Sequence, residues 1–188
     1  VWLYELMQQG SGECVYINVY YKYLLGWIDP IILTEDDGVK KMELYPVEPF
    51  PREAEGAPEA IVLIPDSNAF PFTEYYIVEY RAGGTVFPLE TAIFGKTPGI
   101  VIWHCNTYIN NYGNYSNKNN YLKPVYKSNT EYYNTKDIFI TGDEFSSSTT
   151  PGSHFYDETY TGAYLKVENI MPDKAVLQIG FRDPPLLP

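Results

Sequence analysis

The sequence predicts an all-β protein, a β-sandwich with a short helical segment at its N-terminal end. Short apolar runs rich in β-branched residues recur from residue 31 onward, and Pro, Gly, Asn or Asp ends each run. The 19 tyrosines and 15 prolines among 188 residues favour strands and turns over helices. We therefore expect a helical lead-in over residues 1–28 and a β-sandwich domain over residues 29–188.

The bulk composition excludes several classes of protein. A content of 45% hydrophobic and 16% aromatic residues excludes a disordered chain. The net charge of −11 repels nucleic acid and anionic membranes, so we expect neither as a partner. No apolar run is long enough for a membrane span. The chain starts at Val1 with neither Met nor a signal peptide, so we expect a processed piece of a secreted protein.

Residues 99–106 contain a short apolar run and are predicted to be a central strand. Pro98 and Gly99 precede the apolar residues, and one of the two histidines, His104, lies near the end of the stretch. Alternation assigns its side chains to two faces, Ile100, Ile102 and His104 on one and Val101, Trp103 and Cys105 on the other. Because both faces are apolar, we expect the strand to lie inside a packed sheet.

The expected partner of this strand is residues 73–81. Glu79 and Arg81 share one face of it, so each can satisfy the other, or a neighbour such as His104. A buried structural ion pair and an acid with an anion clamp are the two interpretations of Glu79 and Arg81. For His104, a hydrogen bond to Glu79 or to the backbone competes with metal binding, for which no further ligand is suitably spaced.

The remaining elements follow from local patterns. Residues 20–25 fit a helix that ends at Gly26, although residues 15–17 favour a strand. The turn residues 35–38 predict a hairpin that joins two strands, residues 31–34 and 41–45. Further strands are expected at residues 60–64, 137–141, 162–167 and 175–181.

Several stretches together resemble one protein family. The stretch EYYIVEYR followed by PGIVIWHCN resembles the paired signature E-Y-F-L-x-E-N-R and P-G-x-G-L-L-I-W-H-I-D of the immune inhibitor A-like family of secreted bacterial zinc metallopeptidases. YYKYLLGWIDPIIL, GDEFSSSTTPGSHFYDETYTGAYLKVENI and KAVLQIGF resemble later family motifs, in the same order. The resemblance spans residues 20–181. The sequence departs from the family at Tyr80, at Cys105 and Asn106, and over residues 83–97.

The resemblance implies a non-catalytic part of such an enzyme. The family binds zinc through an H-E-x-x-H helix, and this chain has only His104 and His154 and no such motif. Zinc would then belong to a catalytic domain or chain, which would be the partner of this module together with the protein substrate. By the same resemblance, Trp103 and His104 have a structural role. The sequence leaves open whether the catalytic part belongs to the same gene product.

Calcium is the one cofactor that the residues of this chain suggest. Asp36, Asp37, Asp137 and Asp143 lie in or beside predicted turns, and Ca²⁺ prefers oxygen ligands of this kind. These positions follow no fixed calcium-loop pattern. The alternative is an acidic surface that simply keeps the protein solvated.

Two functions of other classes are alternatives to the non-catalytic peptidase module. The tyrosines between residues 108 and 133, among many asparagines, suit a free-standing glycan- or protein-binding adhesive β-sandwich. The alternative for this tract is an exposed loop without a ligand. A cysteine hydrolase would use Cys14, with Gln9, His154 and either Asp157 or Asn169. Cys14 and Cys105 could instead form a disulfide or remain two unrelated thiols.

Overall fold

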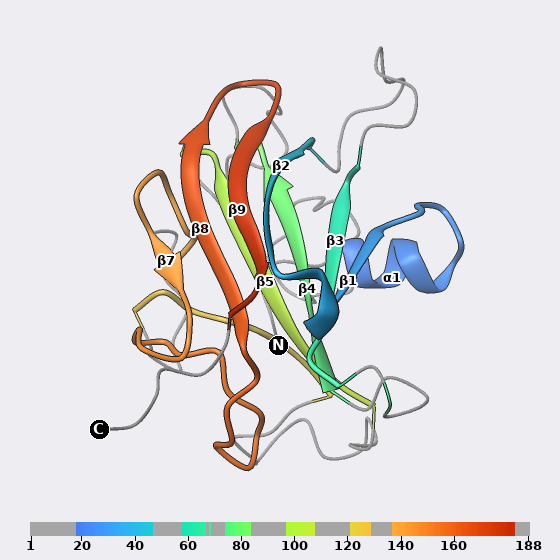
Figure 1. Ribbon diagram of the computed structural model, residues 1–188. Helices are drawn as coiled ribbons and strands as arrows, with labels where there is room; N and C mark the ends of the chain where they lie inside the picture. Colours follow the sequence, from blue (N-terminus) through green and yellow to red (C-terminus); the bar gives the residue numbers. More distant parts are fainter. Residues whose placement is uncertain are drawn as a thin grey trace, which may run out of the picture.

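The protein is all-β, with nine strands, one short α-helix and one 3-10 helix in the described part of the chain (Figure 1). The computed structural model describes residues 18–46, 58–66, 68, 74–83, 97–107, 121–128 and 137–182. The elements are α1 (Val19–Leu24), β1 (Ile31–Thr34), η1 (Glu35–Asp37), β2 (Val39–Leu44), β3 (Ala60–Ile64), β4 (Glu74–Arg81), β5 (Gly99–Asn106), β6 (Leu122–Pro124), β7 (Glu144–Phe145), β8 (Ala163–Ile170) and β9 (Ala175–Phe181).

The strands form two sheets. The five-stranded sheet has the order β1-β3-β4-β5-β6, in which β1 and β3 are parallel and all other pairs are antiparallel. The four-stranded sheet has the order β2-β9-β8-β7 and is antiparallel throughout. The predicted pairing of residues 73–81 with 99–106 is confirmed, because β4 and β5 pair from Glu74 opposite Asn106 to Arg81 opposite Gly99.

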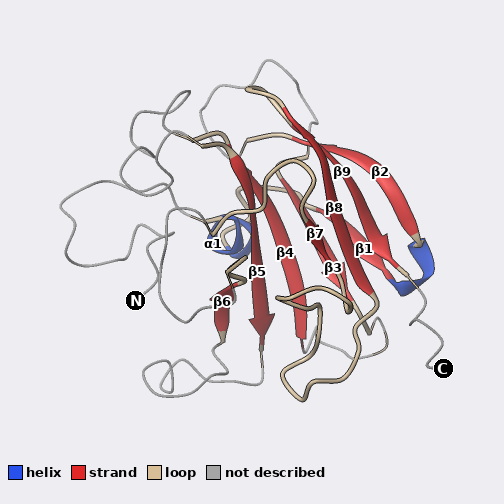
Figure 2. Cartoon of the chain, turned by 90° about the vertical axis from the view of Figure 1, so that its left-hand side faces the viewer, coloured by secondary structure: helices blue, strands red, loops and turns tan. Residues whose placement is uncertain are grey.

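Two hydrophobic clusters cover the two faces of the five-stranded sheet. The inner cluster receives side chains from both sheets, including Ile102 of β5 and Leu177 of β9. The outer cluster contains Val19 and Tyr20 of α1, which pack with Ile77 of β4. Figure 2 shows α1 on the side of this sheet away from β8 and β9. Because both faces of β4 and β5 are covered, these strands are buried over nearly their whole length.

The helix at the N-terminal end of the described chain forms where the sequence predicts it. The side chain of Asn18 caps α1 by accepting a hydrogen bond from the backbone N–H of Tyr21 at 3.1 Å. Gly26 follows the helix with φ of 68°, a conformation that glycine adopts without steric strain. Residues 1–17, which make up most of the predicted lead-in, lie outside the described residues.

The predicted hairpin of residues 31–45 is wrong. β1 pairs with β3 in one sheet, whereas β2 pairs with β9 in the other. Between them, η1 is a 3-10 turn in which Asp37 accepts hydrogen bonds from the N–H and the hydroxyl of Thr34. Thr34 and Asp37 therefore redirect the chain from one sheet to the other instead of folding it back on itself.

Residues 137–141 do not form the predicted strand. Phe139 makes only an isolated bridge to Ile100, although its side chain is buried as the apolar pattern requires. β6 and β7 were not predicted from the sequence. β6 has three residues and β7 has two, which are too few to show an alternating pattern.

Gly180 is the position where a side chain would most disturb the pairing of β2 with β9. Its φ is 145°, and an added Cβ would lie 1.8 Å from the carbonyl oxygen of Gly38. We predict that Gly180→Ala lowers the free energy of unfolding by about 3 kcal/mol, measured by urea denaturation followed by circular dichroism.

Gly142→Ala is the matched control, because Gly142 also has a positive φ, 93°, but has no atom within 4 Å of the added Cβ. We expect it to lose about 1 kcal/mol, from backbone strain alone. Equal losses for the two variants would contradict the close approach of Gly180 to Gly38.

Candidate functional site

The polar residues of β4 and β5 lie on two opposite faces of the sheet. Glu79 and Arg81 of β4 and Trp103 of β5 share the face that α1 covers. Glu74 of β4 and His104 of β5 share the face toward the four-stranded sheet. Alternation of side chains therefore divides the predicted signature residues into two separate sites.

On the outer face, Glu79 is a fully buried carboxylate with three hydrogen-bond donors. Its Oε1 accepts from Trp103 Nε1 at 2.9 Å. Its Oε2 accepts from the backbone N–H of Val19 at 3.0 Å and from Arg81 Nη2 at 3.1 Å. The side chains of Arg81 and Glu79 are 1% and 0% exposed, so the pair has no open side for a substrate. This geometry is that of a structural ion pair, not of an acid with an anion clamp.

On the inner face, Glu74 accepts two hydrogen bonds and lies close to the imidazole of His104. Its Oε1 lies 2.7 Å from His104 Nε2 and accepts from the backbone N–H of Tyr156 at 2.7 Å. Its Oε2 accepts from Asn106 Nδ2 at 2.8 Å. The predicted hydrogen bond between His104 and Glu79 is wrong, because these two residues point to opposite faces. The carboxylate closest to His104 is that of Glu74.

His104 lies between two tyrosine rings. The ring centroids of Tyr76 and Tyr156 are 4.5 and 4.3 Å from that of His104. On its other side, Tyr76 packs edge-on against Phe145 of the four-stranded sheet at 5.3 Å. Burial lowers the pKa of His104, and the carboxylate of Glu74 opposes this shift without cancelling it. The imidazole is therefore neutral at pH 7.

Three of the four carboxylates predicted as calcium ligands accept hydrogen bonds from groups of the protein. Asp37 accepts from Lys40 and Thr34, which lower its pKa to about 2. Asp143 accepts from Lys127 Nζ at 2.6 Å and from the N–H of Ile140 at 2.7 Å. The buried Asp137 accepts from the N–H of Ser128 at 3.0 Å. Among the described residues, no three His, Cys, Asp or Glu side chains gather as a metal site, and the calcium site stays a prediction.

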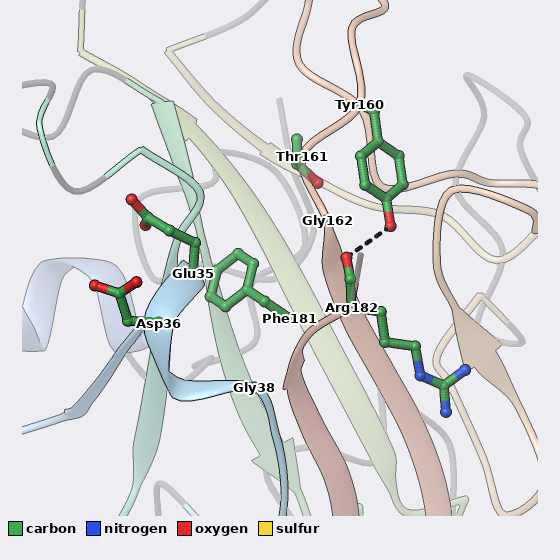
Figure 3. A pocket seen from close by; sticks show the side chains of 8 residues that line it. All are labelled: Glu35, Asp36, Gly38, Tyr160, Thr161, Gly162, Phe181 and Arg182. Atoms are coloured by element: carbon green, nitrogen blue, oxygen red, sulfur yellow. Dashed lines mark hydrogen bonds between the residues drawn. The ribbon is translucent and has the colours of Figure 1, made fainter. Parts of the chain in front are cut away.

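Asp36, the fourth of these carboxylates, lines an open cavity of about 370 Å³ (Figure 3). In Figure 3, Glu35 and Asp36 lie on one side of the cavity and Tyr160 on the other, with the ring of Phe181 between them. The guanidinium of Arg182 points away from the carboxylates. Sequence reasoning missed this cavity because its walls come from segments more than 100 residues apart, which no local pattern connects.

The guanidinium of Arg182 stacks on Tyr164, with Cζ 3.3 Å from the ring centroid. The hydroxyl of Tyr160 donates to the carbonyl oxygen of Arg182 at 3.0 Å. These contacts fix the wall of the cavity opposite the carboxylates.

Several residues of the two competing functions lie outside the described chain. Cys14 and Gln9 are outside the described residues. Cys105 is a buried free thiol, and burial raises its pKa well above the usual value. From the tyrosine-rich tract, Tyr126 is buried in the outer cluster and Tyr121 is hydrogen-bonded to Tyr20. The other tyrosines of the tract are outside the described residues, so glycan binding there stays a prediction.

No protein-family model matches the chain, and no match was found among curated proteins or solved structures. In the part of the chain that the structure describes, none of the helices has the length and apolarity to cross a membrane.

Replacing Glu79 tests the outer network. We predict that Glu79→Gln lowers the free energy of unfolding by about 3 kcal/mol, because it removes the charge that pairs with the buried Arg81. Urea denaturation followed by tryptophan fluorescence measures the loss. Glu43→Gln, at an exposed pair with Lys174, is the control and should change stability far less. A loss at Glu79 no larger than at Glu43 would contradict the network.

The buried thiol gives a second prediction. We expect iodoacetamide to alkylate Cys105 about 100-fold more slowly in the folded protein than in urea, because the thiol is inaccessible and its pKa is raised. Peptide mapping by mass spectrometry separates Cys105 from Cys14. Rapid labelling of Cys105 under native conditions would mean that the thiol is not buried.

Proposed function

We propose that this chain is the C-terminal, non-catalytic β-sandwich of a secreted zinc metallopeptidase of the immune inhibitor A-like type. In this proposal it docks on the catalytic domain, as part of the same chain or as a separate one, and helps to position the protein substrate. Zinc and the general base belong to the catalytic domain. The module itself cleaves no peptide bond.

The contacts of Glu79 are the observation that carries the proposal. Two of the stretches with family resemblance meet at this one carboxylate, EYYIVEYR in β4 and PGIVIWHCN in β5. A third stretch begins at Tyr20, directly after Val19 of α1, whose backbone N–H also donates to Glu79. Motif residues that hold each other in place explain why such stretches would occur together in an architectural module. This role requires no catalytic chemistry from Glu79, Arg81 or Trp103.

The sandwich architecture is supported by the inner cluster. Ile100 and Ile102 from the five-stranded sheet and Leu165 and Leu177 from the four-stranded sheet belong to one contiguous core. Two sheets that bury their facing side chains in a common core are typical of a β-sandwich.

The docking surface in this proposal is the apolar surface beside α1, formed by Leu24, Leu25, Trp27 and Ile32. Their side chains are 59%, 56%, 60% and 44% exposed. Exposed groups of large apolar side chains commonly mark protein contacts. Leu24 is the last residue of α1, and Leu25 and Trp27 follow it, so the apolar surface begins within ten residues of Asn18, the first described residue. In this proposal the catalytic domain docks at this end of the module.

The catalytic part of the proposal is tested with casein. We predict that this chain with Zn²⁺ releases no casein fragments, because no H-E-x-x-H motif occurs in it. Fragment release that a chelator abolishes would contradict the assignment of catalysis to another domain.

The docking part is tested by titrating the chain into the isolated catalytic domain of an immune inhibitor A-like peptidase and measuring binding by calorimetry. We predict that Trp27→Ala weakens binding at least about tenfold, because large aromatic anchors dominate protein interfaces. Ile140→Ala is the matched control, since Ile140 is 39% exposed and lies outside the apolar surface. No binding by the native chain, or equal losses for both variants, would contradict docking through this surface.

A further inference from the structure

Residues 153–161, here called the 153–161 loop, are held against the end of the five-stranded sheet by side chains of β4. Glu74 Oε1 accepts the backbone N–H of Tyr156 at 2.7 Å. The hydroxyl of Tyr76 donates to the carbonyl oxygen of His154 at 2.6 Å. The ring of Tyr156 in turn covers one face of His104. The loop therefore helps to bury the imidazole of His104.

The groups that surround His104 come from three neighbouring elements. Glu74 and Tyr76 face it from β4, Tyr156 faces it from the loop, and Lys123 is its paired residue on β6. Glu74 is the only anion among them, and Lys123 is a cation whose charge disfavours a second positive charge. His104 is 7% exposed, so water reaches it poorly while the loop is in place.

We propose that His104 is a proton-operated latch, which holds the 153–161 loop on the sheet while it is neutral and releases the loop when it is protonated. The loop is the cover that must move for the imidazole to reach water. His104 Nε2 and the N–H of Tyr156 also converge on the same oxygen of Glu74. A full positive charge on His104 competes for that oxygen more strongly than a neutral donor does.

The direction of the pH dependence follows from burial. The pKa of His104 is lowered from its ordinary value of about 6.5 in the closed state. The open state, where the ring meets water, takes up the proton at a higher pH. Opening therefore becomes more favourable as the pH falls below that ordinary value, and stops increasing below the pKa of the closed state.

Release of the loop has a consequence for the cavity next to Glu35 and Asp36. Tyr160 and Thr161 belong to the loop and form part of the cavity wall. The hydroxyl of Thr161 donates to the carbonyl oxygen of Ser153 at 2.7 Å, which ties the two ends of the loop together. Protonation of His104 thus loosens the segment that carries this wall, while the hydroxyl of Tyr160 stays bonded to the carbonyl oxygen of Arg182 and both sheets stay folded.

Amide hydrogen exchange of the whole chain, followed by NMR from pH 7.5 to 5, tests the latch. The protection factor of the Tyr156 amide, corrected for the intrinsic exchange rate, should fall by about tenfold for each pH unit between the two pKa values of His104. Amides of β8 and β9 should keep their protection. Equal loss of protection in β8 and β9 would indicate global unfolding and overturn the proposal.

The two histidines of the chain provide a matched pair of variants. His104→Gln keeps a neutral donor toward Glu74 and should abolish the pH dependence of the loop. His154→Gln should retain it. Loss of the pH dependence in the second variant, or its persistence in the first, would overturn the latch.

A measurement on the native protein covers the case in which His104→Gln does not fold. The imidazole signals of His104 and the amide signal of Tyr156 should titrate with one common midpoint below about 6.5. A Tyr156 amide that follows His154, or that gains protection in acid, would overturn the proposal.

Discussion

The buried carboxylate of Glu79 is the constraint on which the outer half of the structure depends. An ionised side chain without contact to water is tolerated only when donors compensate its lost hydration. Glu79 finds these donors on three segments: the first residue of α1, Trp103 of β5 and its neighbour Arg81. The carboxylate therefore fixes where α1 lies on the sheet and how β4 and β5 are aligned.

The same two strands carry a second polar group on their other face. There Glu74 and His104 lie among aromatic rings that run from Tyr156 through Tyr76 to Phe145. This row connects the end of the five-stranded sheet with the four-stranded sheet. The two polar groups differ in what covers them. Glu79 lies beneath a packed helix, whereas His104 lies beneath a loop that contributes no residue to the inner cluster. Local opening is easier where such contacts are few.

The resemblance to immune inhibitor A-like peptidases gains a physical meaning from these contacts. In the proposed module, the motif stretches of this chain occur together because their polar residues need one another inside the fold. A buried structural carboxylate of this kind restricts the residues around it as strictly as a catalytic carboxylate does, since loss of any partner leaves a buried charge unpaired. In this proposal, the docking function belongs to the surface beside α1, and the motif residues of β4 and β5 have a structural role.

Most strands could be predicted from local pattern, because the burial of a strand of five to eight residues produces a recognisable pattern of apolar residues in the sequence. β3, β5 and β9 begin and end at the predicted residues, and the assignment of Trp103 and His104 to opposite faces was correct. Pairing between distant segments produces no local pattern in the sequence. Sheet membership of β1 and β2, the choice of Glu74 over Glu79 as partner of His104, and the cavity between η1 and residues 160–162 all depend on contacts across many residues. Their geometry is set by how the two sheets pack, because only packing brings groups so far apart in the chain within hydrogen-bonding distance.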